Sequence, residues 1–139
     1  MANAYNSILF TQGTVSFTDF DISFLSNPTT NDLRTKSDVD AIKQSMKILL
    51  FTDMLERPFQ PNLSGNLGQL LFEPYNNLTG ILIKQQITNV LLNEPRIAVR
   101  DVTVITDTTT EGAISISISF IYVNAQTLEN LQVMLTRTR

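Results

Sequence analysis

The chain has 139 residues, a length typical of one domain, and it contains no histidine, cysteine or tryptophan. It therefore has no catalytic dyad or triad that depends on histidine or cysteine, no zinc site with nitrogen and sulfur ligands, and no disulfide. Ten basic and thirteen acidic residues give a net charge of −3, which disfavours binding to a nucleic-acid backbone.

The start of the chain lacks a basic segment followed by a long apolar one, so no signal peptide is expected. The apolar runs are too short for a membrane span. Charged residues make up only 17%, against a typical value of about 25%. A surface rich in neutral polar groups suits a protein covered by partners, although many monomeric proteins have such a surface too.

Residues 1–18 are expected to form an N-terminal arm, and residues 19–139 a single domain. The arm either orders on contact with a neighbouring protein or frays as a terminus. In residues 18–25, Phe20, Ile22 and Phe24 occupy alternate positions, which predicts a short strand. The turn-forming pair Asn27-Pro28 ends that strand.

Two main helices and one short helix are predicted next. The first covers residues 38–52, and the hydroxyl of Ser37 is expected to cap it by accepting from the Asp40 amide. Residues 53–74 contain three prolines and two glycines and should be irregular, apart from a short helix over residues 67–72. The second long helix covers residues 76–92 and ends before Pro95. Its broad apolar face consists of Leu78, Ile81, Leu82, Ile83, Ile87, Val90, Leu91 and Leu92.

The C-terminal part, about residues 97–138, predicts an antiparallel sheet of about three strands. In residues 114–122, Ser115, Ser117 and Ser119 alternate with large apolar side chains, which predicts one buried and one hydroxyl-lined face. Residues 99–106 should pair with this strand through a hairpin at 107–112. A third strand contains Leu131, Val133 and Leu135. The predicted class is α+β, with the helices packed on this small sheet.

Carboxylates are the only side chains that could carry catalysis here. A glycoside hydrolase needs two of them, one with a raised pKa, and Glu56, Glu73 and Glu94 lie at breaks between elements. Nearby Arg57 and Arg96 would lower the pKa of two of these carboxyls, which suits a fixed anion better than a general acid. No Gly-x-Gly-x-x-Gly or P-loop pattern is present. We therefore expect no catalytic residues, cofactor, metal or small-molecule substrate.

The triplet Glu94-Pro95-Arg96 follows the second long helix. Pro95 fixes the backbone, and an acid and a guanidinium stand on either side of it. The arginine could tie helix to strand inside the domain, or it could reach carboxylates and carbonyls of a partner. The residues alone leave both roles open.

Five ordered motifs extend from Asn27 to Arg96. They are Asn27-Pro28, Asp40-Ala41-Ile42-Lys43-Gln44-Ser45, Glu56-Arg57-Pro58-Phe59-Gln60-Pro61, Leu70-Leu71-Phe72-Glu73-Pro74 and Glu94-Pro95-Arg96. With them the chain, from Asp19 to Arg139, resembles the small baseplate wedge protein of contractile, T-even-like phage tails. That family is shared with the type VI secretion baseplate, and some of its members are described as lysozyme-like.

Two loop positions depart from the family pattern. Met54-Leu55 stands where a Pro-Gly turn often precedes the Glu-Arg-Pro-Phe motif, and Ser64-Gly65 reverses the more usual Gly-Ser. Both departures concern the shape of a turn.

The resemblance implies a non-enzymatic structural role in the virion, at the inner ring of a sixfold baseplate assembled in the host cytoplasm. Glu94, Pro95 and Arg96 would dock on the bundle of larger wedge proteins, and Arg96→Ala is expected to weaken docking while leaving the monomer folded. Glu56, Arg57, Pro58, Phe59, Glu73 and Pro74 would have motif or structural roles.

The resemblance also implies that the C-terminal sheet receives extensions of tail sheath subunits as added strands, with Ser115, Ser117, Ser119, Leu131, Val133 and Leu135 in the sheath-binding sheet. The expected partners are other wedge proteins and sheath subunits, with no nucleic acid or membrane. Two alternatives remain open. They are the type VI secretion counterpart of the same part and a muramidase that acts on peptidoglycan.

Overall fold

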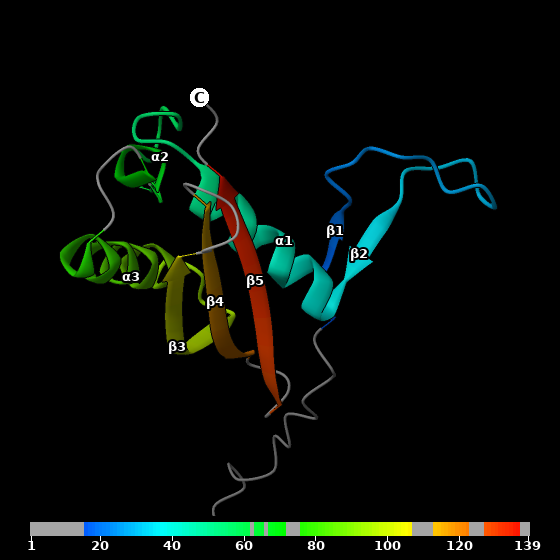
Figure 1. Cartoon of the computed structure of the whole chain (residues 1–139). Coiled ribbons are helices and arrows are strands. Elements are labelled where there is room, and N and C mark those ends of the chain that lie inside the picture. The colour runs from blue at the N-terminus through cyan, green and yellow to red at the C-terminus, as the bar shows by residue number, and fades with distance from the viewer. Residues whose placement is uncertain are drawn as a thin grey trace, which may run out of the picture.

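The C-terminal sheet carries two helices on one of its faces in the computed structural model of the chain (Figure 1). Its strands are β3 (Ile97–Thr106), β4 (Ala113–Tyr122) and β5 (Leu128–Thr136), and they form an antiparallel meander in the order β3-β4-β5. The structure describes residues 16–61, 63–65, 67–71, 76–106, 113–122 and 127–136. Within them the α+β class and the three-stranded sheet predicted from the sequence are confirmed.

The helices are α1 (Asp38–Phe51), α2 (Leu67–Leu71) and α3 (Asn77–Leu91). Each begins and ends within a residue or two of its predicted bounds. Asn76 caps α3, because its side-chain oxygen accepts from the Thr79 amide at 2.8 Å. The expected hairpin at residues 107–112 lies outside the described residues, although β3 and β4 pair as expected.

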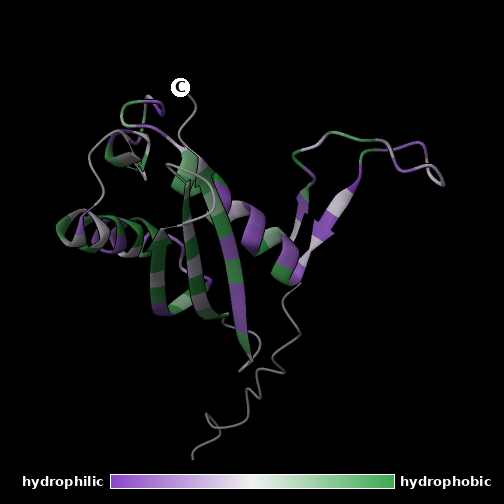
Figure 2. Cartoon of the chain, viewed as in Figure 1, coloured by the Kyte–Doolittle hydropathy of each residue, from purple (hydrophilic) through white to green (hydrophobic). Residues whose placement is uncertain are grey.

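The hydrophobic core lies between the two long helices and the inner face of the sheet. Alternate residues of β4 point inward, as the period of two predicted, and Figure 2 shows the alternation along β4 and β5. The most deeply buried side chains come from α1, α3, β3 and β4 and are Ile42, Met46, Leu50, Ile83, Ile87, Leu91, Val102, Ile116, Ile118 and Phe120.

The predicted apolar face of α3 is only half correct. Ile83, Ile87, Val90 and Leu91 are buried, whereas Leu78, Ile81, Leu82 and Leu92 are exposed. The helix packs mainly against β3 and α1. The stripe of α3 that is buried in the core is therefore narrower than the face formed by the eight predicted positions.

Strands β1 (Thr18–Phe20) and β2 (Thr35–Ser37) pair antiparallel and carry between them the loop of residues 21–34. Residues 17–37, which we call the hairpin arm, project from the α1 side of the domain (Figure 1). The predicted strand over residues 18–25 is wrong beyond Phe20, because the chain turns where the Asp21 carboxylate accepts from the Ser23 amide. Asn27-Pro28 lies in a turn, as predicted.

The start of α1 also differs from the prediction. Ser37 occupies the cap position, but its side chain makes no capping hydrogen bond. Asp38 instead has a φ of 48°, in the left-handed region, and exchanges two hydrogen bonds with the backbone of Phe17. The helix start is therefore joined to the base of the hairpin arm rather than capped by serine.

Candidate functional site

The joint between α3 and β3 is built around one buried carboxylate. Glu94 follows α3 and is only 5% exposed, and among the described residues it is the one buried charged side chain. Arg96 Nε donates to its Oε1 and an Arg96 terminal nitrogen to its Oε2, both at 2.6 Å. Of the two roles left open by the sequence, the internal tie is the one that this geometry displays.

Two further elements meet at the joint. The hydroxyl of Ser45 in α1 donates to Glu94 Oε2 at 2.8 Å. The Arg96 guanidinium also lies over the ring of Phe17, 5.4 Å from its centroid, at the base of the hairpin arm. The pair Glu94–Arg96 thus connects α1, the arm and the start of β3, while Pro95 between them is exposed.

The electrostatics of the joint favour a permanent ion pair. Burial works to raise the pKa of Glu94, but hydrogen bonds from Arg96 and Ser45 and the charge of Arg96 outweigh it, so the pKa lies below its ordinary value. The hydrogen bond to Glu94 raises the pKa of Arg96. A carboxyl group held ionised in this way cannot serve as a general acid near neutral pH.

The Glu-Arg-Pro-Phe motif forms an exposed loop after α1. Glu56 does not pair with Arg57; its carboxylate accepts from the Asp53 amide at 2.9 Å, across one turn. Pro58 is exposed, and Phe59 is almost fully so, at 98%. Glu73 and Pro74, the other motif residues, lie outside the described residues.

The loop returns to α1 through a close backbone contact at Gly65. Its amide donates to the Thr52 carbonyl at 3.1 Å. A Cβ built on Gly65 would overlap the backbone carbonyl of Leu50 and lie 2.9 Å from the Leu50 Cα. A glycine is needed here because any side chain would displace the loop from the end of α1.

The predicted sheath-binding residues lie on opposite faces of the sheet. Leu131, Val133 and Leu135 point into the core from the edge strand β5 and are buried. The three serines, Ser115, Ser117 and Ser119, line the outer face of β4, which is the central strand. Both edges of β4 are already paired, so an incoming strand can reach only β3 or β5.

Sequence reasoning missed three residues that position this site: Phe17, Gln44 and Asp38. Gln44 is 6% exposed, donates to the Phe20 carbonyl at 2.6 Å and accepts from the Ile22 amide at 3.1 Å. In the sequence, Gln44 is only a polar residue between the apolar positions of a helix, which is a weak sign of a positioning role. Its partners could not be predicted, because they lie more than twenty residues away in the chain.

Within the described ranges, each helix falls short of the length and apolarity that crossing a bilayer requires. The same ranges hold no group of three or more side chains suited to binding a metal ion.

The fold and the joint define a class of protein: a small α+β module with a structural ion pair and with exposed large apolar side chains, a surface typical of proteins that contact other proteins. A comparison with protein families matches residues 36–126 to the family described as "Baseplate wedge protein gp25". The chain belongs to this family and is a structural component of the baseplate in contractile, phage-like tails. The resemblance seen in the sequence is thereby confirmed.

Three solved structures share the fold. A candidate tail lysozyme from Geobacter sulfurreducens is 27% identical, with a TM-score of 0.64 over 72% of this chain and 91% of that one. A chain of the anti-feeding prophage baseplate is 20% identical, with a TM-score of 0.60 over 86% and 84% of the two chains. A chain of the postcontracted pyocin R2 baseplate is 19% identical, with a TM-score of 0.56 over 70% and 96%. A comparison with curated proteins gives no match.

Proposed function

We propose that this chain docks on other baseplate wedge proteins and starts the first ring of tail sheath by accepting sheath extensions as added strands. The observation that carries the proposal is the edge strand β5. It pairs with β4 on one side, and no described strand pairs with its other side. Strand addition at such an edge gains main-chain hydrogen bonds, and alternate side chains set the register.

Of the two edges, we assign the added strand to β5. A helix reaches each edge through an ion pair, Lys84 of α3 to Asp101 of β3 and Lys43 of α1 to Glu129 of β5, but only β3 has a helix packed alongside it. Strand β5 lies at the opposite edge (Figure 1) and carries Gln132 and Met134 as exposed outward side chains. The neutral outer face formed with the serines of β4 presents little charge to repel a neighbouring strand.

A reconstruction of the assembled baseplate by electron cryo-microscopy tests this proposal. The expected result is six copies of the chain in the ring, each with one or more extra strands beside residues 128–136. Extra strands beside β3, or a sheet that ends at β5 in particles with assembled sheath, would contradict it. Deleting the gene and restoring it on a plasmid should abolish and then restore sheathed tails.

The docking role of Glu94, Pro95 and Arg96 needs a test that spares the ion pair. Because Glu94 is buried and Arg96 is committed to it, we assign direct contact with the wedge bundle to the exposed Pro95 and the exposed rim of Arg96. Pro95→Ala should reduce co-purification with the wedge proteins without unfolding the domain. Arg100→Ala, at an exposed position of β3 outside the motifs, is the matched control. Equal losses in both variants would count against this assignment.

The proposed role is structural rather than enzymatic. The likeness to a candidate tail lysozyme makes the muramidase alternative worth one direct assay. Glu94 is held ionised, so it lacks the raised pKa that a glycosidase acid requires, and the Glu56 carboxylate accepts a hydrogen bond from the Asp53 amide. Purified protein should leave peptidoglycan intact. Turnover that disappears in Glu56→Gln would overturn this part of the proposal.

We place the protein in the tail of a virion assembled in the host cytoplasm. The secretion-system counterpart would use the same residues in another machine. Neighbouring genes distinguish the two, because capsid and tail-tube genes belong to a phage, whereas a membrane complex and a sheath-recycling ATPase belong to secretion.

A further inference from the structure

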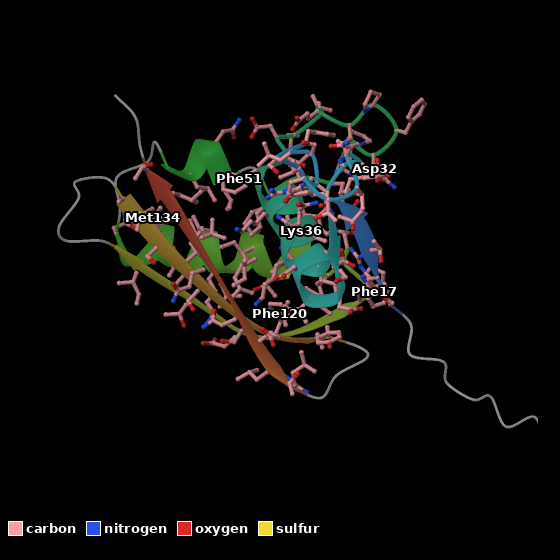
Figure 3. The ribbon with its side chains drawn as sticks, turned by 90° about the vertical axis from the view of Figure 1, so that its right-hand side faces the viewer. Phe17, Asp32, Lys36, Phe51, Phe120 and Met134 are labelled. Atoms are coloured by element: carbon pink, nitrogen blue, oxygen red, sulfur yellow. The ribbon has the colours of Figure 1, made fainter. Side chains whose placement is uncertain are left out.

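A groove of about 530 Å³ separates the hairpin arm from α1. Ile22 and Lys36 of the arm form one wall, and Asp40, Lys47, Ile48 and Phe51 of α1 form the other. Figure 3 views this side of the molecule and labels Lys36 and Phe51. The groove includes Gln44, whose side chain holds the arm to α1.

The walls of the groove are apolar surface that the domain leaves uncovered. Ile22 is 58% exposed and Phe51 is 55% exposed. None of the described residues of the arm is buried, and Figure 2 shows apolar stretches along its projecting loop. Large apolar side chains gathered around a concave surface mark a site that another molecule covers.

The charges of the groove have a definite order. Lys36 is paired with Asp21 at 3.4 Å. Asp40 and Lys47 have no ion-pair partner among the described residues. Two turns of α1, about 10 Å, separate these two residues along the groove. A ligand that fits must therefore offer a basic group opposite Asp40, an acidic group opposite Lys47, and apolar groups toward Ile22 and Phe51.

We propose that this groove binds an amphipathic helix of another baseplate protein. The lining residues of α1 span residues 40–51, about 16 Å, and a helix of three turns has that length. Such a helix would carry acidic and basic side chains two turns apart beside its apolar stripe, in the helix-in-groove mode of recognition. Strand addition is disfavoured here, because β2 has only three residues before α1 begins.

The inference rests on the proposed function, which supplies a baseplate of several proteins as the source of the helix. The test uses whole particles in which Phe51 is replaced by the photo-cross-linker p-benzoylphenylalanine. Phe59, at 98% exposure on the loop after α1 and outside the groove, is the matched control position. After irradiation, mass spectrometry identifies the peptide joined to each position.

We expect position 51 to cross-link to a helical segment of a different baseplate protein, and this segment should have the charge order given above. Its yield should be at least tenfold higher from position 51 than from position 59. Lys47→Glu should lower incorporation of the chain into particles about tenfold. Arg100→Glu, a charge reversal at an exposed position of β3, should leave incorporation unchanged. An adduct to a second copy of this chain or to an extended segment would overturn the inference.

The failure of the inference is distinguishable from failure of the proposed function. Immunoblotting the purified particles shows whether the chain is present. Particles that contain the chain but give no Phe51 adduct overturn only the groove assignment. Particles with sheath but without the chain overturn both.

Discussion

The hydroxyl of Ser45 donates to the carboxylate of Glu94 at 2.8 Å, although 49 positions separate the two residues in the chain. Ser45 ends one sequence motif and Glu94 begins another. The contact explains physically why both motifs belong to one structural unit. The buried carboxylate needs donors from more than one element. The α1 helix supplies one, and Arg96 supplies three, two from its guanidinium and one from its backbone amide.

The ion pair should contribute directly to the stability of the monomer. Arg96→Met removes the guanidinium and leaves the buried Glu94 carboxylate without its main partner, so the free energy of unfolding should fall by about 2–3 kcal/mol, allowing for the partial exposure of Arg96. Urea denaturation measures the change, with Arg100→Met as the exposed control. The expectation that Arg96→Ala leaves the monomer folded stays a prediction, with a reduced free energy of unfolding. A loss of docking without any loss of stability would contradict this account.

Acid should weaken the joint. Because the pKa of Glu94 is lower in the folded state than its ordinary value of 4.5, folding favours the ionised form, and this contribution is present above pH 4.5. It is lost as the pH falls through the lowered pKa of the folded state. The difference in unfolding free energy between the wild-type protein and Glu94→Gln should therefore shrink as pH drops below 4.5. A difference that stays constant between pH 7 and 3 would show that Glu94 does not titrate as inferred.

Gly65 and Gly68 should respond in opposite ways to the same substitution. Gly65→Ala forces a Cβ into the backbone of Leu50 and should cost about 2–3 kcal/mol of unfolding free energy. At Gly68 in α2 the nearest atom to a new Cβ is Asp53 Oδ1 at 3.8 Å, an ordinary contact, and alanine favours a helix. Gly68→Ala should be neutral or raise stability by about 0.5–1 kcal/mol. Thermal denaturation of both variants provides the comparison.

Gln44 should control how firmly the hairpin arm is held. Gln44→Leu removes the partners of the Phe20 carbonyl and the Ile22 amide, so the arm should open more often while the core remains intact. Hydrogen exchange measured by mass spectrometry should quicken in peptides covering residues 17–37 and stay unchanged in β4. Gln85→Leu, at an exposed position of α3, is the control. Faster exchange across the whole domain would point to global destabilisation instead.

Hydrogen exchange should also report strand addition at β5. In the isolated protein, the amides of β5 that bond to β4 are protected and the alternate amides exchange quickly, as at any sheet edge. In assembled tails, about half of the amides of residues 128–136 should change from fast to slow exchange. Peptides of β3 serve as the comparison. Slowing confined to β3 would move the added strand to the other edge.

Periodicity alone was sufficient to predict the framework of the fold. The alternation in residues 114–122 predicted β4 and its buried face, and the helical spacing in α3 predicted Ile83, Ile87 and Leu91 in the core. These patterns are local, and burial on one face enforces them. Alternation failed in residues 21–25, because Asp21 turns the chain and Phe24 stays 70% exposed.

The site was predictable only in part. The sequence showed that Glu94 and Arg96 could pair, since only Pro95 stands between them. It could not show that Ser45 and Phe17 complete the joint or that Gln44 holds the arm, because such contacts depend on how distant elements pack. The overestimated apolar face of α3 has the same cause. Leu78 and Ile81 have the right spacing for burial, but no described element of the chain covers them.

The two hydrogen bonds of Gln44 have a thermodynamic consequence for assembly. A projecting hairpin without buried residues would otherwise sample many conformations, and a partner would bear the entropic cost of fixing one of them. Since Gln44 fixes the base of the arm during folding of the monomer, that cost is met before any partner arrives. The arm can then meet its neighbour preorganised, and more of the contact energy appears as affinity.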